Sequence, residues 1–107
     1  MITAIVQFDL PQDTRPDDVI AVFRQSVPRY RDRPGLIRKY YLLDEPSGKA
    51  GAVYLWETRA AAEATYDEAW RRSFIERYGA APTVAYFDTP VIVDNQAGET
   101  IGEGEAG

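Results

Sequence analysis

The stretch from residue 36 to residue 57 decides the fold of this chain. It begins with Leu-Ile-Arg-Lys-Tyr-Tyr-Leu-Leu over Leu36–Leu43, continues with Asp-Glu-Pro-Ser-Gly over Asp44–Gly48, and ends with Ala-Val-Tyr-Leu-Trp-Glu over Ala52–Glu57. The first and last of these segments are rich in β-branched, apolar and aromatic residues, and the segment between them carries Pro and Gly. This pattern predicts a β-hairpin of two antiparallel strands.

One strand and one helix are predicted before this hairpin. Ile2–Leu10 is dominated by β-branched and apolar residues, which favours a strand. Thr14 can cap a helix, and the apolar residues of Val19–Val27 recur every three or four positions, which predicts one buried helix face. Pro28 lacks a backbone N–H and is expected to end this helix.

One long helix and two strands are predicted after the hairpin. The helix is expected to start at Thr58, a good capping residue, and to stop at Tyr78, before a glycine that tolerates positive φ. Its buried stripe has a four-residue spacing and consists of Ala62, Tyr66, Trp70 and Phe74. Pro82–Phe87 predicts a fourth strand and Val91–Val93 a short fifth one.

The predicted order β-α-β-β-α-β defines an α+β fold of the ferredoxin-like type, with an antiparallel sheet and an extra C-terminal strand. No internal repeat or linker divides the chain, so residues 1–95 are expected to form a single domain. Residues 96–107 form an acidic and Gly-rich tail that is expected to be disordered.

Both faces of the predicted sheet carry large apolar side chains. Alternation along the second strand places Leu36, Arg38, Tyr40 and Leu42 on one face, and Ile37, Lys39, Tyr41 and Leu43 on the other. A sheet with one face in water would alternate more cleanly between apolar and polar residues. Because two helices can cover only one face, the second face is expected to pack against a second copy of the chain, giving a homodimer.

The composition restricts the chemistry, because the 107 residues include no Cys and no His. Disulfides, thiolate nucleophiles, Ser-His-Asp and Cys-His catalytic groups, zinc fingers, iron–sulfur clusters and His-ligated haem are therefore excluded. Any chemistry must use Tyr, Lys, Arg, acidic, amide or hydroxyl side chains, or the reactivity of the substrate itself. The acidic residues show neither a metal-ligand spacing nor a paired acid/base arrangement.

The charge is unevenly distributed along the chain. Twelve basic and 17 acidic residues give a net charge of −5, but four of the acids lie after Val93, which leaves 13 acids against 12 bases in residues 1–93. This balance does not support nucleic-acid binding. The first residues lack the features of a signal peptide, and no stretch approaches the roughly 20 apolar residues of a membrane span. A cytoplasmic protein that does not bind membranes is expected.

Three local motifs carry a resemblance to a known family: Pro34-Gly35, Lys39-Tyr40-Tyr41, and Gly-Ala-Val-Tyr-Leu-Trp over Gly51–Trp56. With these motifs and its element order, the chain resembles the YdhR-type monooxygenases over about residues 2–95. These are small members of the dimeric α+β barrel superfamily, which also holds the antibiotic-biosynthesis monooxygenases. The resemblance implies a homodimer whose sheets face each other, with a ligand cavity in each subunit between sheet and helices. It also implies oxygenation of an electron-rich aromatic or enolic substrate, in several relatives without flavin, haem or metal.

The chain departs from this family at one position. Relatives often carry His on the first strand, about where Gln7 stands, and Gln cannot take up a proton near neutral pH. A histidine-based acid/base role is therefore not transferable. Haem-degrading members of the superfamily rely on a histidine ligand, so haem binding is not expected for a chain without His.

Lys39 and Tyr54 are the candidate catalytic residues. Burial against the helices would lower the pKa of Lys39, which could then stabilise a phenolate or enolate or act as a base. Alternatively, its side chain reaches past the sheet edge to a carboxylate such as Glu57. Tyr54 and Trp56 share a strand face that Tyr41 can join, so they form either an aromatic wall for a flat ligand or ordinary core packing.

Two further residues are candidate substrate contacts. Gln7 lies within an apolar strand, where it either orients a ligand carbonyl or is a hydrogen-bonded core amide. Trp70 either covers the cavity or belongs to the core. A group of basic residues could admit an anionic substrate, and it consists of Arg29, Arg31, Arg33 and Arg38. The interleaved Asp32 favours the alternative that this group is a solvated surface.

The sequence therefore predicts a cofactor-independent, monooxygenase-like oxidoreductase that acts on an aromatic or polyketide-like molecule with molecular oxygen. Lys39 and the Tyr hydroxyls would hold the substrate anion while the rings orient it. The predicted site consists of Lys39 and Tyr54 as catalytic residues, with Gln7, Tyr41, Trp56 and Trp70 as substrate contacts and no metal. Two alternatives stay open: an isomerase or cyclase in the same cavity, and a small-molecule-binding dimer without turnover.

Overall fold

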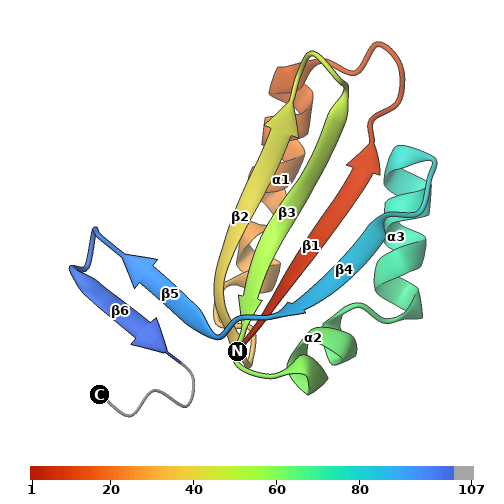
Figure 1. Cartoon of the computed structure of the whole chain (residues 1–107). Helices are drawn as coiled ribbons and strands as arrows, with labels where there is room; N and C mark the ends of the chain where they lie inside the picture. The colour runs from red at the N-terminus through yellow and green to blue at the C-terminus, as the bar shows by residue number, and fades with distance from the viewer. Residues whose placement is uncertain (103–107) are drawn as a thin grey trace.

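The computed structural model of the chain describes residues 1–102, and residues 103–107 lie outside the described part. The elements in chain order are β1 (Ile2–Asp9), α1 (Pro16–Tyr30), β2 (Leu36–Asp44), β3 (Lys49–Trp56), α2 (Arg59–Thr65), α3 (Glu68–Tyr78), β4 (Thr83–Asp88), β5 (Val91–Asp94) and β6 (Glu99–Gly102). Strands β1 to β4 form one antiparallel sheet in the order β2-β3-β1-β4, with α1 and α3 behind it in the view of Figure 1. The predicted α+β, ferredoxin-like arrangement is confirmed.

The hydrophobic core lies between one face of this sheet and the three helices. Alternate residues of β1 and β3 point toward the helices and are almost fully buried, among them Ala4, Val6, Tyr54 and Trp56. The same cluster contains a residue from each helix: Tyr30 of α1, Ala62 of α2 and Trp70 of α3. In the described part of the chain, no helix is long and apolar enough to cross a membrane.

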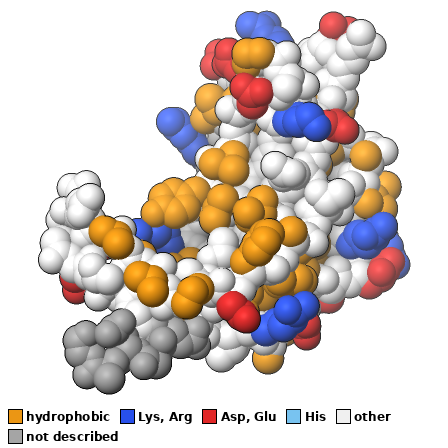
Figure 2. Space-filling model, in the orientation of Figure 1, with side chains coloured by type: hydrophobic (Ala, Val, Ile, Leu, Met, Phe, Trp, Pro, Cys, Tyr) orange, Lys and Arg blue, Asp and Glu red, His pale blue; other side chains and the backbone are white. Residues whose placement is uncertain are grey.

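The other face of the sheet is not covered by any described element and carries exposed apolar residues. Tyr40 and Leu42 of β2 are 51% and 40% exposed, and Phe87 of β4 is 54% exposed. Figure 2, which looks onto this open face, shows hydrophobic side chains gathered over the middle of the sheet. A single copy of the chain therefore leaves one apolar sheet face in contact with water.

A β-bulge interrupts the regular alternation of β2. Leu36 pairs with Trp56 and Arg38 with Leu55, so Ile37 is an extra residue between two successive pairs. As a result Leu36 and Lys39 both face the helices, while Ile37 is 47% exposed. The prediction that Ile37 shares a face with Lys39 was therefore wrong.

The helices also differ from the predicted ones at their ends. Pro28 does not end α1, which continues to Tyr30, because a proline this close to the C-terminus removes only one hydrogen bond of the last turn. Thr14 does not cap α1, since its hydroxyl donates to the Pro11 carbonyl instead.

The single helix predicted between Thr58 and Tyr78 is in fact two helices. Helix α2 ends at Thr65, and α3 begins after Asp67, whose Oδ1 accepts a hydrogen bond from the Trp70 amide at 2.8 Å. Asp67 is therefore the N-cap of a new helix. The predicted buried stripe is nevertheless confirmed. Its four residues pack in or against the core cluster: Ala62, Tyr66, Trp70 and Phe74.

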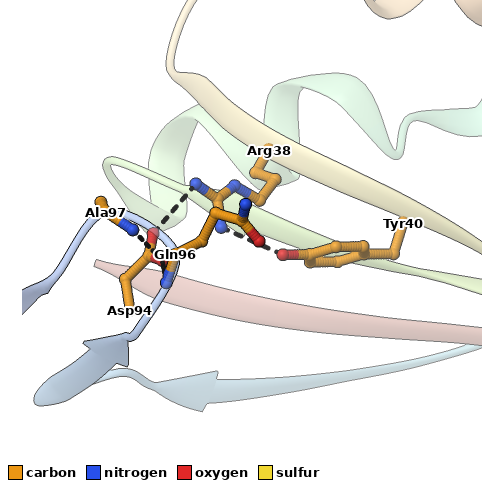
Figure 3. Close-up of polar contacts among 5 residues, drawn as sticks. All are labelled: Arg38, Tyr40, Asp94, Gln96 and Ala97. Atoms are coloured by element: carbon orange, nitrogen blue, oxygen red, sulfur yellow. Dashed lines mark hydrogen bonds and ion pairs between the residues drawn. The ribbon is translucent and has the colours of Figure 1, made fainter.

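The extra C-terminal strand lies outside the main sheet. Strand β5 pairs with β6 in a separate two-stranded sheet that projects away from the domain (Figure 1). Asp94 Oδ2 lies 3.5 Å from Arg38 Nη2, and Arg38 Nη1 donates to the Tyr40 hydroxyl at 3.0 Å (Figure 3). The expectation of disorder from residue 96 onward does not hold for Glu99–Gly102, which has a strand partner in β5. The rest of the predicted tail lies outside the described residues.

Candidate functional site

A pocket lies between the sheet and the helices, within the hydrophobic core. The sheet contributes Lys39, Tyr41 and Tyr54 to its lining, and α1 and α3 contribute residues that include Tyr30 and Trp70. The centre of a water molecule can reach about 40 Å³ of this pocket. This volume is far below the roughly 300 Å³ or more of a typical small-molecule site, so a ring-bearing ligand requires the lining side chains to move.

The amine of Lys39 is enclosed by aromatic rings. Its Nζ lies 3.5 Å from the ring centroid of Tyr30, 4.0 Å from that of Tyr41 and 4.6 Å from that of Tyr54. Lys39 makes no ion pair with Glu57 or with any other carboxylate of the described residues. The alternative in which Lys39 reaches a carboxylate at the sheet edge is therefore not the arrangement observed.

This environment lowers the pKa of the Lys39 amine, so the amine can act as a base near neutral pH. Burial, together with the nearby charge of Arg29, lowers the pKa of Lys39 to about 7. The three ring faces act in the opposite direction, because their quadrupoles attract the ammonium form. Both protonation states are therefore accessible near neutral pH, so the amine can accept a proton and then hold an anion.

The two tyrosines of the sheet stay protonated and can act only as hydrogen-bonding groups. Burial raises the pKa of Tyr54 far above its ordinary value, and Tyr54 is only 1% exposed. Burial also raises the pKa of Tyr41, whose hydroxyl lies 2.7 Å from Ser26 Oγ. Ser26 Oγ donates to the Phe23 carbonyl, so the Tyr41 hydroxyl is the donor of the bond to Ser26.

Tyr30 and Trp70 connect the two helices across the pocket. Trp70 Nε1 donates to the Tyr30 hydroxyl at 3.0 Å, and both residues are buried. Tyr30 was not predicted as a pocket residue, because the helix was expected to end at Pro28. A signal was present, since Tyr30 lies seven positions after Phe23 and so continues the same helix face.

Gln7 and Trp56 lie outside the pocket, contrary to their prediction as substrate contacts. Gln7 is exposed on the open face of the sheet, because its neighbours Val6 and Phe8 on β1 take the positions that face the helices. Trp56 is fully buried beside Tyr54, and its Nε1 donates to the Tyr66 hydroxyl at 2.9 Å. Trp56 is a core residue in this arrangement.

The predicted basic group separates into different environments. Arg29 lines the pocket, Arg33 Nε donates to Thr65 Oγ1 at 3.0 Å, and Arg38 pairs with Asp94. Arg77 of α3, which the sequence did not single out, also lines the pocket. Among residues 1–102, no group of three or more Asp or Glu side chains is arranged to hold a metal ion.

The fold and the pocket together define a ferredoxin-like α+β domain with an aromatic, lysine-containing pocket between its sheet and its helices. The chain belongs to the ydhR family: residues 5–84 match the family model described as "Putative mono-oxygenase ydhR". No curated protein matches the chain.

Solved structures share the fold. An antibiotic biosynthesis monooxygenase is 22% identical with a TM-score of 0.63, and the match covers 83% of this chain and 98% of that one. A protein of Bordetella bronchiseptica described as "Putative antibiotic biosynthesis monooxygenase" is 21% identical with a TM-score of 0.61, and the match covers 82% of this chain and 95% of that one. The R26S mutant of MhuD, solved with two manganese protoporphyrin IX molecules per active site, is 15% identical with a TM-score of 0.67. That match covers 88% of this chain and 99% of the MhuD chain. At such identities the likeness shows the fold alone.

Proposed function

We propose that this protein is a monooxygenase that oxidises an aromatic or enolic, polyketide-like small molecule without a cofactor. The observation that carries this proposal is the amine of Lys39, held among three ring faces with a pKa of about 7 and with no carboxylate partner among the described residues. Family membership supports the reaction class, and the pocket supports a flat substrate with an acidic proton.

In the proposed reaction the substrate supplies the electrons. The neutral Lys39 amine takes the proton of a phenol or of a carbon next to a carbonyl, and the resulting ammonium stabilises the phenolate or enolate. The anion transfers one electron to dioxygen, and the two radicals combine to form a carbon–oxygen bond. For a ring CH₂ group, one oxygen atom ends in the new carbonyl and the other leaves as water with both hydrogens.

The aromatic rings would orient the substrate during this reaction. Tyr41 and Tyr54 of the sheet and Trp70 of α3 present ring surfaces to the pocket, where a flat molecule can stack. Because Tyr54 keeps its proton, its assigned role is that of a hydrogen-bonding group, and the base is Lys39. Displacement of pocket water by the substrate would strengthen the attraction between the ammonium and the anion.

Oxygen consumption with anthrone or 1-naphthol tests this function. We expect Lys39→Met to lower the rate by about 10²- to 10⁴-fold, as for loss of a general base. Lys49→Met is the matched control, because Lys49 is 66% exposed and pairs with Asp9 outside the pocket, and it should leave the rate unchanged.

Two results would contradict the proposed reaction. Turnover that persists without oxygen would favour an isomerase or cyclase in the same pocket. Binding without turnover, with Lys39→Met changing only the affinity, would favour a small-molecule-binding protein.

We also propose that the working protein is a homodimer formed across the open face of the sheet. The exposed apolar residues of this face include Tyr40, Leu42 and Phe87, and no described helix covers them. A second copy is the occupant we favour, because an apolar patch is self-complementary and a two-fold contact places the same patch on both sides.

A further inference from the structure

Three cationic residues line the pocket, and two of them, Arg29 and Arg77, are also exposed to solvent. Arg29 lies in the last turn of α1, Arg77 in the last turn of α3 and Lys39 on β2, and all three line the same cavity. Among residues 1–102, no Asp or Glu lines it. The position of each arginine near a helix C-terminus is favourable for the helix dipole, but that effect does not require either side chain to face the pocket.

The charge of the two arginines is not neutralised by the protein. Within residues 1–102, neither Arg29 nor Arg77 lies within 4.0 Å of a carboxylate oxygen. Asp67 lines an adjoining groove with Arg29, but its Oδ1 accepts the Trp70 amide hydrogen. Several surface arginines also lack an ion pair, so the distinguishing feature is that these two flank an apolar, aromatic pocket.

We propose that the pocket selects an aromatic carboxylate, with the ring among the aromatic side chains and the carboxylate bound by Arg29, while Arg77 adds to the positive charge of the pocket. This assignment deepens the proposed function and rests on it for the role of the ring. Guanidinium groups bind carboxylates through paired, charge-assisted hydrogen bonds, which an amine provides only as a point charge. A cleft lined by charges of one sign also raises the local concentration of the opposite ion.

The effect of Arg29 on Lys39 agrees with this arrangement. The charge of Arg29 contributes to the lowered pKa of Lys39, so these two cations repel each other. A bound carboxylate would reduce that repulsion, whereas a neutral ring would leave it in place.

Isothermal titration calorimetry with 2-naphthoate and its neutral isostere 2-naphthamide tests the proposal on the full chain. We expect the carboxylate to bind at least about tenfold more tightly, a preference that shrinks at high salt. Arg29→Gln should weaken binding of the carboxylate by about tenfold and Arg77→Gln by a smaller factor, and each should change binding of the amide by less than about twofold. Arg24→Gln and Arg71→Gln are the matched controls, because they lie on the same two helices and do not line the pocket.

Several outcomes would overturn the assignment. The first is a carboxylate that binds no more tightly than the amide, or no binding of either compound. The second is an equal loss of affinity in the control variants, which would indicate a general charge effect. The third is loss of the preference in Lys39→Met, which would place the anion at the lysine.

The proposed function is judged separately, by oxygen consumption with neutral anthrone. If anthrone is not oxidised, the preference for the carboxylate over the amide can still be measured. If that preference is absent, oxidation of anthrone is still expected.

Discussion

Lys39 occupies an environment in which two effects on its charge oppose each other. Removal of the amine from water favours the neutral form, whereas the ring faces of Tyr30, Tyr41 and Tyr54 favour the ammonium. Desolvation, together with the charge of Arg29, lowers the pKa to about 7. A lysine packed only for structure would be more stable with its amine in water, so this placement favours a chemical role.

The lowered pKa of Lys39 also predicts how folding stability depends on pH. In the unfolded chain the amine keeps its proton up to about pH 10.5, whereas in the folded chain it loses the proton above about pH 7. The unfolded state therefore binds more protons in this window, and the free energy of unfolding rises with pH by up to about 1.4 kcal/mol per pH unit. Urea unfolding at about pH 7.5 and about pH 9.5 measures this slope.

The control for this slope is Lys39→Met, in which the rise between the two pH values should largely disappear. An equal slope in the wild-type protein and in Lys39→Met would show that Lys39 has an ordinary pKa in the folded state.

Substitution of Trp56 is expected to change the free energy of unfolding much more than substitution of Gln7. Trp56→Phe removes buried volume and the hydrogen bond to the Tyr66 hydroxyl, which should lower the free energy of unfolding by about 2 kcal/mol or more. Gln7→Ala changes an exposed side chain on the open face and should change it by less than about 0.5 kcal/mol. Chemical denaturation of both variants checks the difference, and a costly Gln7→Ala would contradict the placement of Gln7.

Part of the site could be predicted from the sequence. Lys39, Tyr41 and Tyr54 line one pocket, and the sequence could place them together because strand alternation relates residues on one face. Gln7 was misplaced because polar character within an apolar strand does not reveal which face a residue takes. Tyr30 was not predicted because the helix was expected to end at Pro28, and Arg77 was not predicted because its place beside the pocket depends on how α3 packs against the sheet.

At the scale of elements, the close approach of β1 and β3 depends on Gly51. A Cβ atom added at Gly51 would lie 2.1 Å from the Val6 carbonyl oxygen, and both backbones are fixed by strand pairing. We expect Gly51→Ala to lower the free energy of unfolding by about 3 kcal/mol or more, or to prevent folding. Thermal or urea unfolding measures the effect.

Gly48→Ala is the matched control for Gly51→Ala. Gly48 has a φ of +68° but open space around its missing side chain, so only a backbone penalty of about 1–2 kcal/mol is expected. A milder effect at Gly51 than at Gly48 would contradict the close contact with Val6.

Element types were easier to predict than element ends. The strands and helices follow from hydrophobic periodicity, which reflects burial over many residues. The end of α1 and the break between α2 and α3 each depend on one residue, Pro28 and Asp67, whose effect the surrounding packing decides. Of the β5–β6 hairpin only β5 was predicted, because Glu99–Gly102 has too little apolar character to indicate a strand by itself.

At the scale of the whole molecule, the chain is less compact than its length suggests. Its radius of gyration is 15.1 Å, compared with about 13 Å for a compact domain of this size. The β5–β6 hairpin projects from the domain (Figure 1) and carries exposed apolar residues, Val91 and Val93. Both features suit a chain that is completed by association.

The proposed homodimer predicts a specific effect of charge on the open face. Leu42→Glu should convert the dimer to a monomer at micromolar concentration, because it places a carboxylate within an apolar contact. Ile75→Glu is the control, since Ile75 is similarly exposed at 43% but lies on α3, on the other side of the sheet. Light scattering coupled to size-exclusion chromatography measures both masses, and a monomeric wild-type protein would rule out the dimer.

The bulge in β2 has a consequence for how this chain can vary over evolution. Ile37 has no partner on β3, so a homologue can lose that residue and still present its lysine toward the helices. An insertion or deletion between Lys39 and Tyr41 would instead turn one of them to the opposite side of the sheet. Length differences among homologues are therefore expected to collect just before the lysine and to avoid the residues that follow it.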